Sequence, residues 1–242
     1  MENGSPGVTR WLDIAPDRLA AWLESFGQRH GTVTAEAEPQ PLARVVTFRA
    51  TDGSVAQCHI PFPPLPAGAA DGTDHAALAG RIAAHACAAR VVGVLLVRLG
   101  GYAAGVFAGP DQQLVASKVG SRLVHGRSAA GGTSQRRFAR RREKQASEAL
   151  TAAASTAAAV FGPYAGRLDA VVLGGDKRAM SGLGSDPRLR PYLDLAVDRF
   201  LTVPDPRLAV LRGTPRMFRA IQIRLTEPPR PPEPRLPASG PG

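Results

Sequence analysis

The feature that most constrains the fold is a proline-free, alanine-rich run from Ser134 to about Phe161. Alanine is the best helix former, so the run predicts one helix of ~28 residues, ~42 Å long at ~1.5 Å per residue. Its first half carries too many arginines to be buried, because an unpaired charge in a core costs several kcal/mol, and we expect that half to project from the protein. The second half offers a stripe of mostly small apolar residues for close packing on a sheet, namely Leu150, Ala153, Ala154, Ala157, Val160 and Phe161.

The positive charge of the chain is concentrated around the start of this helix. The stretch from Lys118 to Lys144 contains nine Lys and Arg and one Glu, a formal charge of +8, whereas the whole chain carries +10. Clustered cations neutralise phosphates and release counterions, so the favoured partner is a polyanion. A solvated basic helix behind an ordinary linker would carry the same charge, and charge alone does not decide between the two.

A loop of small and polar residues leads into the helix. Gly131 and Gly132 permit positive φ and close approach of the backbone to another molecule. Ser134, or the threonine before it, can cap the helix and leave Gln135 in the first turn, where free N–H groups and the helix dipole favour a phosphate. The sequence thus places a neutral amide at the tip of a cationic rod.

The order of residues in this region resembles a known catalytic loop. His125-Gly126-Arg127 is followed by Gly131-Gly132-Thr133-Ser134-Gln135 and then by Arg137-Phe138-Ala139-Arg140. Eukaryotic and archaeal class 1 peptide-chain release factors carry a similar His-Gly-Arg-Gly-Gly-Gln loop and Arg-Phe-Ala-Arg helix in their central domain. Here two residues separate the glycine pair from the glutamine. This form resembles the release-factor-like peptidyl-tRNA hydrolases of ribosome-associated quality control, most closely their actinobacterial branch, and the resemblance extends over roughly Val91 to Leu183.

The resemblance implies a role for each part of the region. The loop would enter the peptidyl-transferase centre of the large ribosomal subunit, where Gln135 would promote detachment of the nascent chain from tRNA. An amide cannot deprotonate water, but it can position an attacking group, and N–H groups around glycines can stabilise an oxyanion. The implied catalytic set is Gly131, Gly132, Ser134 and Gln135. The implied set for binding rRNA and the tRNA acceptor end is Lys118, Arg122, His125, Arg127, Arg136, Arg137, Arg140, Arg141, Arg142 and Lys144.

Two chemistries fit the resemblance, and the sequence does not separate them. Water can attack the peptidyl ester, or a ribose hydroxyl can cut the tRNA near its 3′ end. We therefore expect a peptidyl-tRNA hydrolase or a tRNA 3′-end endonuclease, a monomer whose partners are the large subunit, peptidyl-tRNA and rRNA. The alternative from another class is a non-catalytic rRNA- or tRNA-binding factor of ribosome assembly or hibernation.

Metal and nucleotide sites are not indicated. Cys58 and Cys87 have no CxxC spacing, and no set of residues has the usual spacing of metal ligands. The turn Gly174-Gly175-Asp176-Lys177 follows a predicted strand, but it lacks the GxxxxGK[ST] pattern of a phosphate-binding loop. We expect no metal, no nucleotide and no other cofactor.

Two further alternatives have little support. A serine nucleophile needs a strained elbow such as GxSxG, and the residues around Ser134 lack the second glycine. A membrane-bound basic helix should carry bulky apolar residues opposite its charges, and near the arginines only Phe138 qualifies. No apolar segment approaches the ~20 residues that cross a bilayer, and the first residues do not form a leader, so we expect no membrane contact and a cytoplasmic protein.

The remaining patterns predict an α/β (α+β) fold in which helices flank a mixed β-sheet, similar to the release-factor central domain. We expect an amino-terminal layer at 1–72, a catalytic domain at 73–226 and a disordered proline-rich tail at 227–242. Helices are expected at Pro16–Phe26 and Asp74–Ala86 and, in part, at Pro187–Phe200 and Pro206–Arg212. Strands are expected at Ala43–Ala50, Val55–Ile60, Val91–Val97, Tyr102–Phe107, Gln113–Val119, Leu168–Leu173 and Phe218–Leu225.

Overall fold

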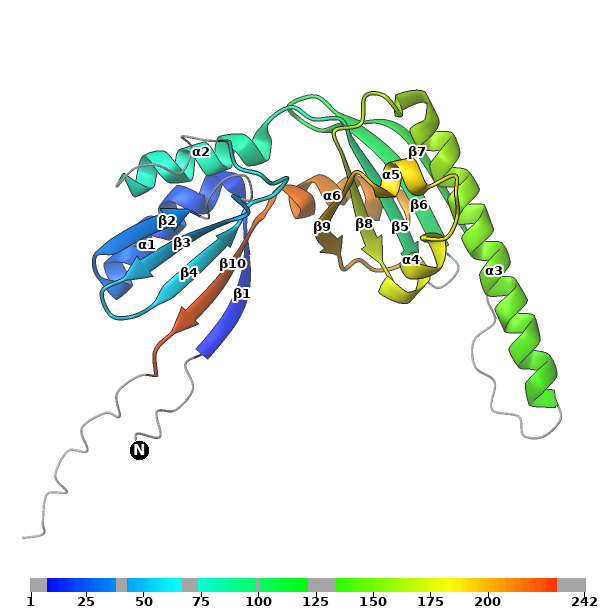
Figure 1. The fold of residues 1–242 in the computed structure, drawn as a ribbon, viewed down its shortest axis with the longest axis horizontal. Coiled ribbons are helices and arrows are strands. Elements are labelled where there is room, and N and C mark those ends of the chain that lie inside the picture. The colour runs from blue at the N-terminus through cyan, green and yellow to red at the C-terminus, as the bar shows by residue number, and fades with distance from the viewer. Residues whose placement is uncertain (1–7, 38–42, 67–73, 99–100, 122–133, 230–242) are drawn as a thin grey trace, which may run out of the picture. The chain divides into compact units, whose positions relative to one another are not determined.

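The computed structural model describes residues 8–37, 43–66, 74–98, 101–121 and 134–229, with the backbone alone for residues 37 and 134–142. The chain divides into two compact units, each with its own five-stranded sheet (Figure 1). The first unit combines the chain up to Ile82 with the chain from Ile221 onward. The second unit is Ala83–Ala220.

The first unit is an antiparallel sheet with the strand order β1-β10-β4-β3-β2. One face is covered by α1, whose Leu19, Leu23 and Phe26 are buried. The predicted first helix and the hairpin β3–β4 are confirmed. The elements of this unit are β1 (Val8–Ile14), the 3-10 turn η1 (Pro16–Arg18), α1 (Leu19–His30), β2 (Val33–Ala37), β3 (Val45–Ala50), β4 (Val55–His59), β10 (Ile221–Glu227) and the first residues of α2 (His75–Cys87).

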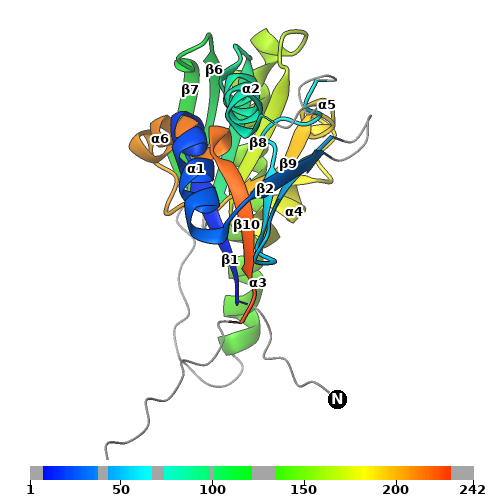
Figure 2. The ribbon, with the colours of Figure 1, turned by 90° about the vertical axis from the view of Figure 1, so that its left-hand side faces the viewer.

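The last strand returns to the first unit. The strand expected at Phe218–Leu225 is β10, which pairs with β1 and β4, and Figure 2 shows it beside β1. The chain therefore passes from one unit to the other between residues 82 and 83 and between residues 220 and 221. The sequence analysis expected these boundaries at 72/73 and 226/227. Alternation of Ile221, Ile223 and Leu225, all fully buried, specifies a half-buried strand, but it does not say which sheet the strand joins.

The second unit is a mixed sheet with the strand order β7-β6-β5-β8-β9 and helices on both faces, which confirms the expected fold class. Strands β5, β6 and β7 form the predicted antiparallel meander, and β8 and β9 run parallel to β5. Its elements are β5 (Val92–Arg98), β6 (Gly101–Ala108), β7 (Gln113–Ser121), α3 (Ser134–Phe161), the 3-10 turn η2 (Gly162–Tyr164), β8 (Ala170–Gly175), α4 (Lys177–Leu183), α5 (Arg190–Leu193), β9 (Ala196–Leu201) and α6 (Leu208–Arg219).

The segment between β8 and α6 is helical in part, as expected, and also contains a strand that was not predicted. Of the stretch Pro187–Phe200, which was expected to be helical in part, only the four residues of α5 are helical, and Ala196–Leu201 forms β9 at the edge of the sheet. Parallel pairing with β8 supplies the partner that makes this segment a strand, and that partner is not visible in a local pattern.

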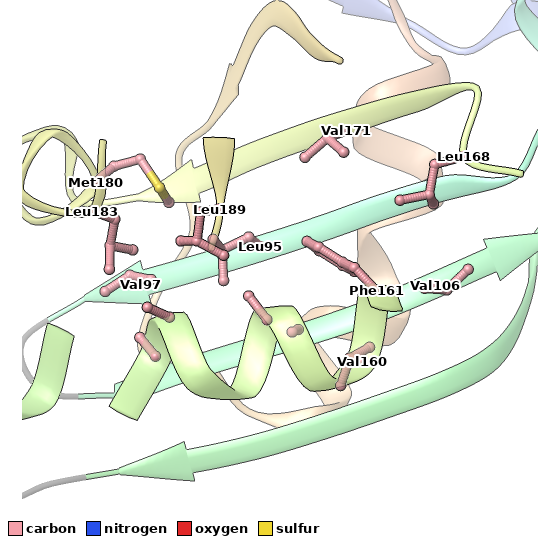
Figure 3. Close-up of a cluster of buried hydrophobic side chains, with 14 residues drawn as sticks. Leu95, Val97, Val106, Val160, Phe161, Leu168, Val171, Met180, Leu183 and Leu189 are labelled. Carbon is pink, nitrogen blue, oxygen red and sulfur yellow. The ribbon is translucent and has the colours of Figure 1, made fainter. Parts of the chain in front are cut away.

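The second half of α3 is anchored on the sheet by small side chains, as predicted. Ala153, Ala154 and Ala157 are fully buried, and Phe161 is 1% exposed. These residues share one cluster with Leu95 and Val97 of β5, Ala104 and Val106 of β6, and Met180 and Leu183 of α4 (Figure 3). Because alanine carries only a methyl group, the helix lies close to the strands over this length.

Enlarging one of these alanines should lift the helix from the sheet. We expect Ala157→Leu to destabilise the protein by about 1–3 kcal/mol, because a leucine does not fit a fully packed contact. Chemical denaturation would measure the change in unfolding free energy. Ala159→Leu, at an exposed position two residues further on, is the matched control and should change it by no more than about 0.5 kcal/mol. Equal effects of the two substitutions would contradict the packing described.

Candidate functional site

One edge of the second sheet collects the ends of several strands. Strands β8 and β9 run parallel to β5, and β7 also does so because both it and β5 are antiparallel to β6. The carboxyl ends of these four strands therefore meet at the same edge, and ligands of open α/β sheets bind at such edges. The chain leaves β7 at Ser121 on this edge and re-enters the described structure at Ser134, the first residue of α3.

The first half of α3 extends beyond the sheet (Figure 1). The first buried side chain of the helix is Ala149 among those that the structure describes. Glu143, Lys144 and Glu148 are exposed, which confirms the predicted projection for this part of the helix. Residues 134–148 would span ~22 Å at ~1.5 Å per residue, and we call this segment the stalk.

The structure places the predicted site residues unevenly. Ser134 and Gln135 occupy the first two positions of α3, and Arg136, Arg137, Arg140, Arg141 and Arg142 follow on the stalk, with side chains outside the described part. Lys118 on β7 and Lys144 on the stalk are exposed. The remaining predicted residues lie outside the described residues, and these are Arg122, His125, Arg127, Gly131 and Gly132.

Lys118 lies on the same face of the sheet as α3. It is the direct cross-strand partner of Ala104, and such partners project to the same side of a sheet. Ala104 is buried in the cluster that packs against α3. Because β7 is an edge strand, the Lys118 ammonium remains in solvent beside the helix that carries the arginines.

The base of the stalk is braced by its neighbours. Gly182 of α4 approaches Leu150 so closely that a Cβ at this glycine would lie 2.8 Å from the leucine Cδ1. One turn further along α3, Ser155 Oγ accepts a hydrogen bond of 2.9 Å from Arg188. Arg188 also donates to both carboxylate oxygens of Asp186, and these hydrogen bonds hold the pKa of Asp186 below its ordinary value. The stalk therefore leaves the sheet from a fixed base.

Two further cations lie at this edge, and the sequence analysis predicted no binding role for them. Lys177 and Arg178 are exposed at the start of α4, directly after β8 ends. The Lys177 ammonium lies 5.7 Å from the centre of the Phe200 ring. The sequence signal that could have identified these two cations is their position directly after a buried strand. Because that strand runs parallel to its neighbour, its carboxyl end lies at the same edge of the sheet.

The glycine pair before these cations serves packing. A Cβ at Gly174 would lie 2.7 Å from the carbonyl oxygen of Leu201, and Gly175 has a φ of +105° with its Cα against the backbone of Val97. Asp176 accepts a hydrogen bond of 2.9 Å from the Ala179 N–H and caps the seven-residue α4. Neighbouring strands therefore leave no room for a side chain at either glycine.

Gly175 should therefore be intolerant of any side chain. We expect Gly175→Ala to destabilise the protein by about 3 kcal/mol or more, because the new methyl group would overlap the carbonyl of Val97 in an unfavourable backbone conformation. Gly166→Ala is the control, since a Cβ there meets nothing within 4 Å. Thermal or chemical unfolding of the two variants would test this, and similar stability would refute the packing role.

A histidine in the first unit has the neighbours of a hydrolase triad but not its geometry. His30 Nδ1 lies 2.8 Å from Asp52 Oδ2 and 3.0 Å from Ser54 Oγ, while Nε2 lies 3.5 Å from Glu227 Oε1. A proton relay needs the serine and the carboxylate on opposite ring nitrogens. Here both contact the same nitrogen, so the group fixes the β3–β4 turn against α1 and the end of β10.

This cluster gives a pH-dependent contribution to stability. Burial alone would raise the pKa of Asp52, but hydrogen bonds from His30 and Ser54 outweigh it and hold the pKa below its ordinary value. A depressed carboxyl pKa stabilises the fold above the unfolded pKa, and the effect is lost as the pH falls through the folded value. We expect Asp52→Asn to cost no more than about 1 kcal/mol near pH 7, and less near pH 3, because the side chain is 40% exposed. Urea unfolding at the two pH values would measure it, and a larger cost at pH 3 would contradict this account.

The described residues contain neither a cluster of metal ligands nor a membrane-spanning helix. Within 8–37, 43–66, 74–98, 101–121 and 134–229, no three His, Cys, Asp or Glu side chains gather as metal ligands would. Over the same residues, none of the helices combines the length and apolarity needed to span a bilayer. Cys58 is buried, which raises the pKa of its thiol, and Cys87 is exposed.

The family model for the Actinobacteria/chloroflexi VLRF1 release factor matches residues 90–224, more than half of the 242-residue chain. The chain belongs to this release-factor family. The match begins just before β5 and ends within β10, so it contains the predicted loop and all of α3. The family resemblance read from the loop and helix is thereby confirmed.

Comparison with other proteins adds little beyond the family. A solved structure described as "Archaeal protein" is similar at 13% identity with a TM-score of 0.36. The similarity covers 87% of this chain and 65% of the archaeal chain, so the present chain spans about two thirds of its length. No curated protein matches.

Proposed function

We propose that this VLRF1-family protein is a ribosome-associated peptidyl-tRNA hydrolase that frees nascent chains from tRNA on stalled large ribosomal subunits. The observation that carries the proposal is that the family match contains both the Gly-Gly-Thr-Ser-Gln loop and the helix that projects from the sheet. Its partners would be the large subunit, rRNA and peptidyl-tRNA, and its place of action the cytoplasm, where ribosomes work.

The stalk supports the proposal by its length and charge. It places Gln135 near the tip of a segment of ~22 Å that starts from a fixed base, which suits entry into a narrow RNA cavity. The arginines on the same segment match the phosphates that would line such a cavity. Lys118, Lys177 and Arg178 extend the positive charge to the edge of the sheet from which the stalk emerges.

Gln135 would act by positioning. Its amide oxygen can accept a hydrogen bond from an attacking water while its N–H groups hold a second acceptor, and N–H groups at Gly131 and Gly132 can donate to the developing oxyanion. The water oxygen would bond to the ester carbonyl carbon, the bond to the ribose oxygen would break, and that oxygen would take up a proton. The surrounding RNA would exclude other water, so orientation replaces a strong base.

Cleavage of the tRNA itself is the second chemistry for the same loop. A ribose hydroxyl would lose its proton and attack the phosphorus of a phosphodiester near the 3′ end. The bond from phosphorus to the 5′ oxygen of the next nucleotide would break, that oxygen would take up a proton, and the peptide would leave with a short piece of tRNA. The two reactions are distinguished by the tRNA product, because hydrolysis of the ester leaves the 3′ end complete.

Replacement of the glutamine is the direct test. On large subunits that carry stalled peptidyl-tRNA, we expect Gln135→Ala to slow peptide release by on the order of 100-fold or more, because the attacking group loses its positioning partner. Gel analysis would follow both the released peptide and the length of the tRNA. Gln145→Ala, which removes a half-buried glutamine from the same helix, is the matched control and should release at the wild-type rate.

Two outcomes would reject the assignment. Release at the wild-type rate by Gln135→Ala would remove the glutamine from the mechanism. Ribosome binding without release, by the wild type as well as the variant, would favour a non-catalytic rRNA-binding factor of ribosome assembly or hibernation.

A further inference from the structure

Helix α6 carries arginines and no acidic residue. Arg207 precedes the helix and Arg212, Arg216 and Arg219 lie along it, and the segment from Arg207 to Arg219 contains no Asp or Glu. Elsewhere positively and negatively charged residues are more balanced, since the whole chain has 30 Lys and Arg and 20 Asp and Glu. Outside the stalk region this segment is therefore a second local concentration of positive charge.

The apolar side of α6 seats it on the sheet. Leu211, Thr214 and Phe218 are buried, and the Phe218 ring lies 6.0 Å from that of Phe107 on β6. A Cβ at Gly105, between Phe107 and Ala103 on the same side of β6, would lie 2.9 Å from a methyl group of Leu211. The alternate residues of β6, Ala104 and Val106, belong to the cluster under α3. Helix α6 therefore covers the face opposite α3 (Figure 1).

The arginines of α6 divide into two kinds. Arg219 donates hydrogen bonds to the backbone carbonyls of Cys87 and Pro110, so it fixes the end of the helix. Arg207, Arg212 and Arg216 are exposed. In the described part of the structure, their side chains form no hydrogen bond or ion pair. Arg212 and Arg216 lie on the solvent side of the helix, away from the buried Leu211, Thr214 and Phe218, whereas Arg207 is the residue that precedes it.

Their presence does not help the helix itself. Arg212 and Arg216 are four residues apart, and like charges at this spacing repel each other and weaken a helix. Gly213 and Pro215 both lie between these two arginines and are poor helix formers, so the helix propensity of the segment is low. Exposed arginines without acidic partners on a helix of low propensity are better explained by binding to an anionic partner than by solvation.

We propose that the outward face of α6, formed by Arg212 and Arg216, binds the phosphate backbone of RNA as a second contact separate from the stalk. Guanidinium groups form charge-assisted, often bidentate hydrogen bonds with phosphate oxygens. Arg212 and Arg216 are one helical turn, ~6 Å, apart along the axis, which allows contact with neighbouring phosphates of one strand. The identification of this RNA as ribosomal rests on the proposed function.

Because α6 and α3 cover opposite faces of one sheet, the two contacts require different RNA segments. The stalk would reach into a cavity, while α6 would rest on backbone outside it. The α6 contact would then contribute to affinity and orientation and would take no part in the chemistry.

The salt dependence of binding separates this contact from the stalk. The full-length protein would be titrated with purified large ribosomal subunits and, separately, with a fluorescent RNA duplex over a range of salt concentrations. We expect the double variant Arg212→Gln/Arg216→Gln to reduce the slope of log K against log salt by about two, because each phosphate contact contributes about one. The matched control is Arg49→Gln/Arg190→Gln, which removes the same charge from exposed positions on β3 and α5 and should leave the slope within about half a unit of the wild type.

A stalk variant, Arg140→Gln/Arg141→Gln, completes the comparison, and circular dichroism would verify that each variant is folded. The inference is overturned if the α6 variant keeps the slope of the control pair, or if an acidic polyglutamate peptide competes with RNA at equal charge concentration. If only the stalk variant has a smaller slope of log K against log salt than the wild type, the α6 contact is rejected and the proposed function is left intact. Loss of slope in the α6 variant, together with wild-type release by Gln135→Ala, supports the contact and rejects the proposed chemistry.

Discussion

The close packing of alanine side chains against the sheet determines how the second unit is arranged. A helix that rests on methyl groups lies near the strands, and it is held by a large apolar cluster over its second half. Its first half has no such stripe and carries a row of arginines, which cost too much free energy to bury without partners. One continuous helix thus has an anchored half and a projecting half, and the position of the anchor decides how far the tip stands from the sheet.

The topology of the sheet supports this division. Four strands end at the edge from which the stalk emerges, and α4 and the turn before it close the same edge by tight backbone contacts. The glycines there are needed because neighbouring strands leave no room for a side chain. Exposed cations lie at this edge of the sheet, whereas the interior of the unit is almost entirely apolar. Charge and packing are therefore separated along α3, which is consistent with the proposal that one segment enters RNA while the rest stays folded.

Several elements show where local sequence fails as a guide. Strand β9 follows a short helix, and its segment is a strand because β8 lies beside it. Strand β10 has the alternation of a half-buried strand, yet it pairs with β1 and β4 at the other end of the chain. Strands β1 and β2 were not predicted. In β1, Val8–Ile14 lies at an edge of the sheet, and its exposed positions hide the alternation of buried and exposed residues. The arginines of the segment 207–219 are close together in the sequence, but only the structure shows that Leu208–Arg219 is one helix with Arg212 and Arg216 on its solvent side.

The sequence by itself determined the long helix, its division into a basic and an apolar half, the meander before it and the family of the loop. These features depend on residues close together in the chain, through helix propensity, periodicity and the spacing of a motif. The tertiary structure alone decided which strands share a sheet, that Gly174 and Gly175 serve packing, and that a second basic helix covers the opposite face from α3. These features depend on contacts between residues far apart in the chain, and the free energy of such contacts exceeds local preference without leaving a local pattern.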